Sequence, residues 1–250
     1  MTSDSVPCVG FWRRLAAFIV DGFVVIVPLQ LATVVLFSLT DAKVQGSFLG
    51  TKQCEQVTHL PQGLDPPPFA GANWAEICKF SFFGFQTAHV LTVSTVTQNG
   101  STTKIISRSY TLDGEGRPNS AFVADWLAIL LLFAYVIPFE TLRGATFGKS
   151  LVRIRTVVKK TPERIGLPLK TTLGREGAKL LGFIPGLMFP LMFLAGYGPD
   201  NPQWDEVFWP LSLCVLAVSF AWAVWNIADV VRKRDPIYDR LAGTAVLRKQ

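Results

Sequence analysis

Charged residues, histidine and cysteine are all scarce in this sequence. Charged residues make up 17% of the 250 positions, against about 25% in soluble domains. The chain has only two histidines, His59 and His89, and four cysteines, and their spacings fit no zinc-binding motif. Both histidines fall in one polar loop, which argues against a Ser-His-Asp or Cys-His catalytic set. We therefore expect no catalytic residue, no metal ligand and no cofactor, and we do not expect an enzyme.

Nucleotides and nucleic acids are also unsuitable ligands. Residues 144–150 read GATFGKS, but a P-loop needs four residues between its glycines and follows a parallel strand. The net charge is +6, but the basic residues cluster beside apolar runs. The positive-inside rule predicts this placement for membrane proteins, so it does not indicate a basic nucleic-acid-binding surface.

Long apolar runs are what the chain has in abundance. Half of its residues are hydrophobic and its mean hydropathy is +0.35. The first run opens at Arg13 and Arg14, continues to Phe37 and contains a carboxylate, Asp21. It exceeds the about 20 apolar residues that a helix needs to cross a bilayer. Its length and the lack of a clear cleavage site distinguish it from a cleaved signal peptide, so we interpret it as a retained membrane helix.

The runs together predict an all-α membrane bundle of four transmembrane helices with a small β-rich extracytoplasmic inserted domain. Helix three is expected from Leu180 to Tyr197, broken or tilted by its prolines, and helix four from Val207 to Val230. The predicted parts are transmembrane helix one in residues 1–40, the insertion in 41–120, helix two in 121–142, a basic cytoplasmic amphipathic segment in 143–179, helices three and four in 180–230, and a basic tail in 231–250.

The distribution of Lys and Arg sets the expected topology. Residues 143–179 carry many cations and only two carboxylates, Glu163 and Glu176, so this side is expected to be cytoplasmic, with both termini inside. Phe147, Leu151, Ile154 and Val158 recur at helical spacing among these cations, although a strand at residues 152–158 is an alternative. We expect this segment to lie on anionic lipid. The basic residues expected to face lipid are Lys149, Arg153, Arg155, Lys159 and Lys160.

The insertion carries the signals of strands. Residues 80–98 and 102–112 are suited to strands, and Asn99-Gly100 between them is a strong hairpin signal. An oxidising compartment and a small core both favour a disulfide between Cys54 and Cys78, with two free thiols as the alternative. His89 on this hairpin is expected to be solvated.

Asp21 is the polar residue that most needs a partner. A charged carboxylate inside a span costs several kcal/mol unless it is paired or hydrated. Arg14 lies on the same helix face but about two turns away, so we expect the partner to come from another helix. The candidates are Asn226, near the inner end of helix four, and a cation folding back from the basic segments. Arg14, Asn226 and Asp229 could also line a polar route to Asp21.

Three segments resemble the RDD family of bacterial membrane proteins. They read GFWRRLAAFIVD, TFGKSLVRIRTVV and YDRLAGTAVL. The family is named for one arginine and two aspartates. By position the arginine is Arg14, with Arg13 as the alternative, and the first aspartate is Asp21. The second is Asp239, with Asp229 as the alternative.

The resemblance implies a bacterial cytoplasmic (inner) membrane protein, and members have been proposed to move unidentified ligands. We therefore expect ion or small-solute transport, with proton coupling at Asp21 as one form of it. Four spans are few, so transport would need a homo-oligomer. The large insertion departs from the family pattern and favours an alternative, a non-enzymatic accessory or assembly subunit of a larger membrane complex whose outer domain binds a partner.

Overall fold

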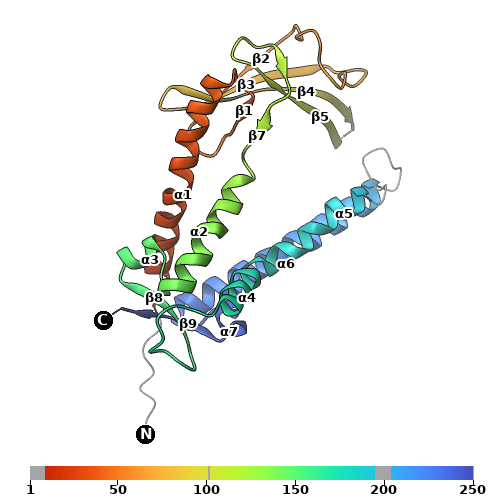
Figure 1. Ribbon diagram of the computed structural model, residues 1–250. Helices are drawn as coiled ribbons and strands as arrows, with labels where there is room; N and C mark the ends of the chain where they lie inside the picture. Colours follow the sequence, from red (N-terminus) through yellow and green to blue (C-terminus); the bar gives the residue numbers. More distant parts are fainter. Residues whose placement is uncertain (1–8, 101, 195–203, 250) are drawn as a thin grey trace. The chain divides into compact units, whose positions relative to one another are not determined.

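The computed structural model describes residues 9–100, 102–194 and 204–249. The chain forms two compact units, and its elements are drawn in Figure 1. Unit 1 contains Met1–Asp21 and Ala134–Gln250, and unit 2 contains Gly22–Phe133. Helices α1 and α2 each pass from one unit into the other.

Among the described residues, two helices are long and apolar enough to cross a membrane. Helix α1 runs from Phe11 to Leu39, and helix α6 runs from Trp204 to Val231, of which Val207–Val231 meets this criterion. These helices match the first and fourth predicted spans. The other two predicted spans are not shown as continuous apolar helices of that length.

Helix α2 is shorter than predicted, since it runs from Leu127 to Arg143 and has 17 residues. Two short strands, β6 (Pro118–Asn119) and β7 (Phe122–Val123), occupy the positions before it. The third predicted span is divided into α4 (Leu169–Leu180), the 3₁₀ helix η1 (Leu181–Leu187) and α5 (Met188–Leu194). Pro185 lies in η1 and removes a helical donor. The predicted end of this span, Tyr197, lies outside the described residues.

Unit 2 is built on a five-stranded antiparallel sheet in the order β2-β3-β4-β5-β6. The long strands are β2 (Thr51–Gln56), β3 (Trp74–Phe82), β4 (Phe85–Asn99) and β5 (Thr102–Leu112). Leu91, Val93, Tyr110 and Leu112 form the core on one face, which Val57, Leu64 and Ala72 cover. In β4 the side chains that face this core therefore stand at odd-numbered positions.

The predicted hairpin is present, with two corrections. The run at 80–98 is interrupted by a turn at Phe83-Gly84, so it contributes to two strands. Asn99 pairs with Thr102, so the β4–β5 connection begins at Gly100, which has φ +60°. Asn99 therefore belongs to the ladder and not to the turn.

The predicted disulfide joins Cys54 to Cys78, which are direct partners on β2 and β3. The expectation that His89 is solvated was wrong, because its side chain is 3% exposed. Its Nδ1 lies 2.8 Å from the carbonyl oxygen of Asp113. Burial lowers the pKa of His89, although this hydrogen bond acts in the opposite direction.

A second, two-stranded sheet connects the ends of α1 and α2 within unit 2. Strand β1 (Val44–Gln45) follows α1 and pairs in parallel with β7, which precedes α2. The Gln45 side chain is buried and donates to the carbonyl oxygens of Ala42 and Leu112, while its Oε1 accepts from the His89 amide. This glutamine therefore fastens the end of α1 to strands β4 and β5.

Unit 1 contains the segment that the sequence predicts to be a basic amphipathic surface. It forms α3 (Phe147–Leu151), strand β8 (Ile154–Val158) and α4. The helical spacing ends at Arg153, which has φ +54°, and the alternative prediction of a strand is correct at Ile154–Val158. Strand β8 pairs with β9 (Thr244–Arg248) of the tail, and Ile154 and Val246 pack on Ala17 of α1.

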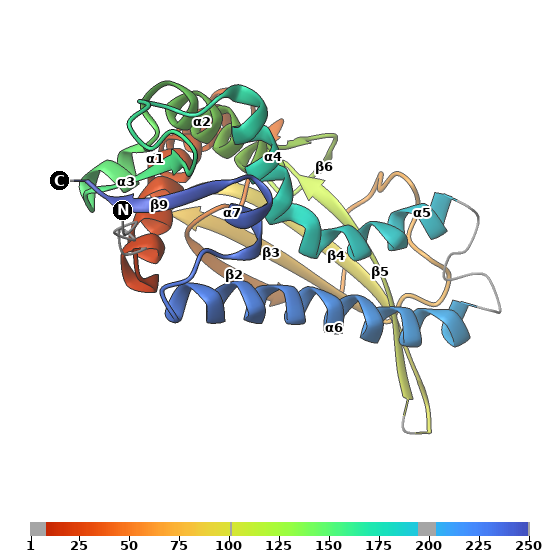
Figure 2. The same ribbon diagram turned by 90° about the horizontal axis from the view of Figure 1, so that it is seen from below.

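The remaining helices of unit 1 lie along one another. In Figure 2 the short helix α7 (Ile237–Leu241) lies between α4 and α6, and α6 contacts η1 directly. Gly182 makes this contact close, because a Cβ there would lie 2.3 Å from the Trp222 ring. Helix α7 follows α6 and packs on α4.

Candidate functional site

Asp21 is 5% exposed and receives three hydrogen bonds. The Tyr135 hydroxyl donates to Oδ1 at 2.8 Å, the Thr146 hydroxyl donates to Oδ2 at 2.5 Å, and the Gly148 amide donates to Oδ1 at 2.8 Å. The partners come from α2 and from the start of α3. Asp21 thus has the interhelical partners that the sequence predicts, but these three donors are uncharged.

The Thr-Phe-Gly-Lys sequence at 146–149 explains how α3 reaches Asp21. Thr146 is the N-cap of α3 and accepts from the Lys149 amide while it donates to Asp21. A Cβ at Gly148 would lie 2.2 Å from the Ala17 carbonyl oxygen and 2.9 Å from Asp21. Only glycine therefore allows the first turn of α3 to pack so closely on α1.

A fully buried carboxylate, Asp239, lies between two arginines. Arg14 donates from Nη1 to Oδ2 at 2.8 Å, and Arg175 donates from Nε to Oδ1 at 2.6 Å. The Thr244 hydroxyl donates to the same Oδ1 at 3.0 Å. Burial alone would raise the pKa of Asp239, but the two guanidinium groups outweigh it and hold this pKa well below its usual range. The ion pairs join α1, α4 and α7.

A second buried carboxylate, Glu140 at the end of α2, continues this network. Arg175 donates from Nη1 to both Glu140 oxygens, at 2.8 and 2.9 Å. Lys149 donates from Nζ to Glu140 and, at 2.9 Å, to the Thr156 hydroxyl. Burial lowers the pKa of Lys149 to about 8, because the loss of hydration outweighs the attraction of Glu140.

We call these residues together the charged cluster. Glu176 completes it by contacting both Arg175, at 3.3 Å, and Lys179, at 2.5 Å. The charged cluster consists of Arg14, Glu140, Lys149, Arg175, Glu176 and Asp239. Lys179, at the edge of the cluster, is a fourth cation, so each of the three carboxylates has two cationic partners.

The residues of the charged cluster and the residues that contact Asp21 all lie within the region matched by a family model. A profile of the RDD family matches residues 8–243. The chain belongs to the RDD family. No curated protein and no solved structure matches it. The family assignment rests on this profile match, and the contacts described above show which groups Arg14, Asp21 and Asp239 bond.

The RDD positions proposed from the sequence fall into two groups. Arg14 and Asp239 contact each other, and Asp21 lies on the same helix as Arg14 with separate partners. The alternative aspartate, Asp229, pairs instead with Arg240 at 2.6 Å. Arg13 is exposed. The geometry therefore brings together Arg14 and Asp239, and not Arg13 or Asp229.

Both candidates for the partner of Asp21, Asn226 and a cation from the basic segments, were wrong, since the described hydrogen bonds to Asp21 come from Tyr135, Thr146 and Gly148. Asn226 bonds elsewhere. Its Oδ1 accepts from the Ile237 amide at 2.9 Å, and its Nδ2 donates to the Trp222 carbonyl at 2.8 Å. Asn226 thus joins α6 to the start of α7. The hydrogen bonds of Arg14, Asn226 and Asp229 with described residues all end on groups other than Asp21.

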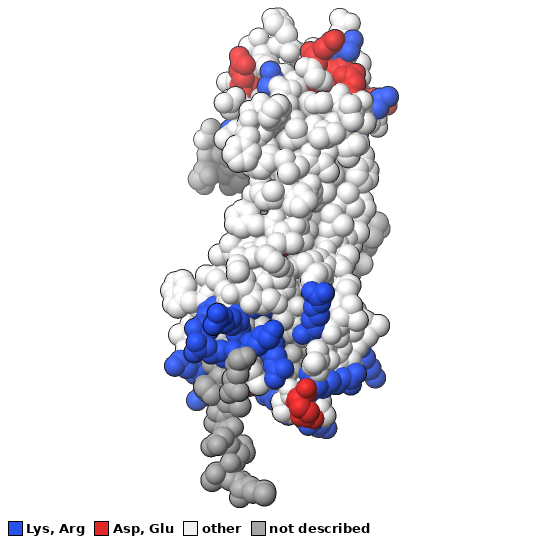
Figure 3. Space-filling view, turned by 60° about the vertical axis from the view of Figure 1, so that its left-hand side comes forward, with Lys and Arg blue, Asp and Glu red and all other residues white. Residues whose placement is uncertain are grey.

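The basic residues expected to face lipid differ in their exposure and in their partners. Lys149 is half-buried and belongs to the charged cluster, because its ammonium group bonds to Glu140 at the end of α2. Arg153, Lys159 and Lys160 are exposed, and Arg155 is half-buried. Lys159 pairs with Asp235 at 2.9 Å. In the view of Figure 3, Lys and Arg dominate the charged surface of unit 1, beside a small acidic patch, whereas Asp and Glu are about as prominent as Lys and Arg on the surface of unit 2.

Sequence reasoning missed Tyr135, Thr146, Gly148, Glu140 and Arg175 as site residues. Two signals could have found some of them. Glu140 is a carboxylate at the end of an apolar run, where it needs a partner. The short Thr-Phe-Gly-Lys sequence places a cap, a close-packing glycine and a cation in one turn. No comparable local signal marks Arg175, because the two fully buried carboxylates that it bonds, Glu140 and Asp239, lie 35 and 64 residues away in sequence.

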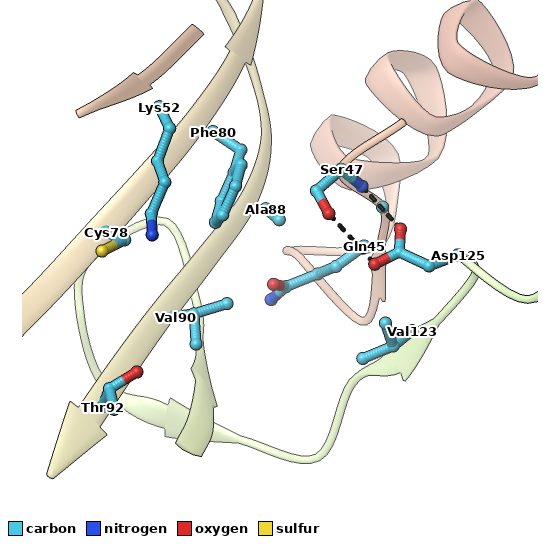
Figure 4. A pocket seen from close by; sticks show the side chains of 11 residues that line it. Gln45, Ser47, Lys52, Cys78, Phe80, Ala88, Val90, Thr92, Val123 and Asp125 are labelled. Carbon is cyan, nitrogen blue, oxygen red and sulfur yellow. Dashed lines mark hydrogen bonds between the residues drawn. The ribbon is translucent and has the colours of Figure 1, made fainter. Parts of the chain in front are cut away.

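Unit 2 has a separate small cavity of about 150 Å³ on the second face of the sheet. Phe80, Ala88 and Val90 form its apolar wall, and Lys52 lies at its side (Figure 4). Asp125 accepts from the amide and the hydroxyl of Ser47, at 2.7 and 3.0 Å, on the opposite side. Among the described residues, one group of possible metal ligands occurs, Cys54, Glu76 and Cys78, but the disulfide occupies both of its sulfur atoms.

Proposed function

We propose that this RDD protein is a non-enzymatic accessory subunit of a larger complex in the bacterial cytoplasmic membrane, with unit 2 as its partner-binding module. The observation that carries this proposal is that Arg14, Asp21 and Asp239 all bond inside unit 1. Side chains that bond in this way are suited to a structural role, in which they hold the cytoplasmic segments of unit 1 against α1. They leave the inserted sheet as the part of the chain available for recognition.

We further propose four membrane-embedded segments, formed by α1, α2, α4–η1–α5 and α6. Helix α2 has 17 residues, which give a length of about 26 Å, near the lower limit for a span. The Lys and Arg excess of residues 143–179 supports a cytoplasmic unit 1, and the disulfide supports an oxidising side for unit 2. Arg153 and Lys160 are exposed and suit anionic lipid headgroups on the inner leaflet.

The edge strand β2 is the proposed partner surface. It is the terminal strand of the sheet, and all six of its residues are exposed. An exposed edge offers backbone amides and carbonyls to an added strand. Lys52 belongs both to this edge and to the wall of the cavity in Figure 4. An extended segment of a partner along β2 could therefore also place a side chain near the cavity.

Photocrosslinking in native membranes tests the accessory role. A benzoylphenylalanine replaces Gln53 on β2, and in a matched control it replaces Glu115, which is exposed on another loop of unit 2. We expect a defined cross-link from position 53 to a protein other than this chain, and much less from position 115. Cross-links that join only copies of this chain, or equal labelling from the two positions, would contradict the proposal.

Ion or solute transport is a second candidate, and one observation favours it. Asp21 contacts only uncharged donors among the described residues, so it can exchange a proton without breaking an ion pair. Under this function, reconstituted protein should move monovalent cations in a pH-dependent way, and Asp21→Asn should abolish that flux. Wild-type vesicles without flux between pH 6 and pH 9 would remove cation/proton antiport and leave the accessory role.

A further inference from the structure

An exposed aromatic turn joins strands β3 and β4 in unit 2. Phe82 pairs with Phe85 across the turn, and Phe83-Gly84 forms its two-residue tip. Phe83 is 87% exposed and Phe85 is 64% exposed. The rings of Phe82 and Phe83 lie in edge contact, with centroids 4.6 Å apart. The turn therefore presents a cluster of aromatic surface that the described part of unit 2 does not bury.

The backbone of this turn makes phenylalanine an unfavourable choice for folding. Phe83 has φ +48° and Gly84 has φ +86°. Positive φ at both central residues is the signature of a type I′ turn, for which asparagine followed by glycine is preferred. A bulky residue is strained in this left-handed region. Phe83 thus has no backbone reason to be there, and its edge contact with Phe82 leaves it 87% exposed, which indicates a contact outside the described chain.

The chain next to the turn is fixed beside α1 before that helix ends. Gly50 lies against the Ser81 carbonyl at the end of β3, where a Cβ would be 2.1 Å away. The preceding residue, Leu49, donates its amide to Oε1 of Gln30 at 3.2 Å. Gln30 is fully buried and lies nine residues before the last residue of α1, Leu39. The loop before β2 thus lies against the C-terminal part of α1.

The length of α1 places this loop near the edge of a bilayer. Its 29 residues give about 43 Å, which exceeds the about 30 Å of a hydrocarbon core, so part of the helix must extend past the core. With Arg13 and Arg14 at the inner edge of the core, Gln30 lies about 24 Å further along the helix, which is about 6 Å inside the outer boundary of a core about 30 Å thick. Groups fixed beside Gln30 are then near the level of the interface.

A second exposed aromatic pair of unit 2 lies where the chain enters α2. Phe122 and Trp126 lie in edge contact at 5.8 Å, just before α2 begins, and both are about half-exposed. They occupy the point where the chain leaves the sheet for a helix of apolar sequence. Aromatic side chains concentrate at this boundary between headgroups and hydrocarbon in membrane proteins.

We propose that the aromatic turn Phe82–Phe85 inserts into the outer-leaflet interface of the bilayer and holds the sheet of unit 2 against the membrane. The occupant of this surface is lipid, because Gly50 lies against Ser81 beside the turn and the preceding residue, Leu49, is hydrogen-bonded to Gln30 of a membrane helix near interface depth. The inference rests on the proposed membrane placement of α1. It does not depend on which partner β2 binds or on transport.

Depth-dependent quenching tests the insertion. Cys8→Ser and Cys214→Ser remove the other thiols and leave the disulfide in place. A nitrobenzoxadiazole probe is then attached to Phe83→Cys or to Leu60→Cys in phosphatidylcholine nanodiscs. Leu60 is a matched exposed apolar residue in the segment between β2 and β3. Nanodiscs leave both sides open, so the result does not depend on topology.

We expect lipids spin-labelled near the headgroup to quench the probe at position 83 several-fold more than the probe at position 60. We expect aqueous iodide to show the reverse preference. Equal iodide quenching at the two positions would overturn the proposal. A probe at position 83 that is shielded from both quenchers would also overturn it, because protein would then cover the turn.

Phe83→Asn separates membrane contact from folding. Asparagine tolerates the positive φ of this position better than phenylalanine, so the turn should be kept or stabilised. A probe on Phe85→Cys should nevertheless lose several-fold in lipid quenching when residue 83 is asparagine. Unchanged lipid quenching in this variant would contradict an anchoring role for Phe83.

Discussion

The charged cluster of unit 1 and the sheet core of unit 2 hold distant chain segments together in different ways. In unit 1, Asp239 and Glu140 are fully buried and are neutralised by arginine and lysine from other elements. In unit 2, Leu91, Val93 and Leu112 form an apolar core, and a disulfide closes one edge of the sheet. A buried ion-pair network fails when one partner is removed, whereas an apolar core loses stability in proportion to the volume removed.

The largest effect is expected from removing Arg175, because it serves two carboxylates. Arg175→Ala leaves Asp239 with Arg14 alone and Glu140 with Lys149 alone. Loss of one partner of a buried ion pair costs about 3–5 kcal/mol. Thermal unfolding in detergent should therefore show a strongly lowered midpoint. Lys160→Ala removes an exposed cation and should leave the midpoint nearly unchanged; equal effects of the two variants would contradict a structural charged cluster.

The disulfide of unit 2 should have the next largest effect. Cys54→Ser with Cys78→Ser opens a link between residues separated by 24 positions. A loop of that length predicts a loss of about 3 kcal/mol from the greater entropy of the unfolded chain. Hydrogen–deuterium exchange should rise in β3 and β4, while α3 and α7 in unit 1 stay protected. Increased exchange in both units would show that the disulfide stabilises more than its own sheet.

Gly148 tests close packing beside Asp21. Gly148→Ala places a methyl group against the Ala17 carbonyl and Asp21, and overpacking of this kind costs about 1–3 kcal/mol. Gly174→Ala is the matched control, since a Cβ at Gly174 in α4 meets nothing within 4 Å. The control should gain about 0.5–1 kcal/mol from helix propensity. If Gly148→Ala is as stable as the control, α3 does not pack on α1 as described.

The smallest effect concerns pH and unit 2. Burial lowers the pKa of His89, so the folded sheet holds it neutral at pH values where the unfolded chain binds a proton. The stability of unit 2 should therefore fall as pH drops from about 6.5 toward this lowered pKa. Exchange of β4 amides at pH 7.5 and 5.5, corrected for intrinsic rates, measures this slope. His89→Gln should flatten the slope, and His59→Gln, at an exposed position, should not.

The sequence predicted unit 2 better than unit 1 because the signals of unit 2 are local. The strand-suited runs, Asn99-Gly100 and the cysteine pair are each signals within a short stretch of sequence, so the hairpin and the disulfide could be predicted. His89 was missed because its burial depends on Gln45 and Asp113, which alternation in a strand does not reveal.

In unit 1 the decisive contacts join segments far apart in sequence. Arg14 and Asp239 are separated by 225 positions, and Thr146 and Asp21 by 125. The family resemblance identified Arg14, Asp21 and Asp239, but composition and spacing could not show which groups they bond. The assignment of Lys149 to a lipid-facing surface failed for the same reason, since helical spacing does not reveal the buried Glu140 on another helix.

The ion pair between Arg14 and Asp239 is the contact on which a structural role for the RDD residues depends most. A double-mutant cycle of Arg14→Gln and Asp239→Asn, followed by unfolding in detergent, measures their coupling directly. We predict a coupling free energy of at least about 1 kcal/mol, because the two side chains bond at 2.8 Å in a buried site. The parallel cycle of Arg14→Gln with Asp229→Asn should be additive, since Asp229 pairs with Arg240. Additive effects of Arg14→Gln and Asp239→Asn would contradict the account.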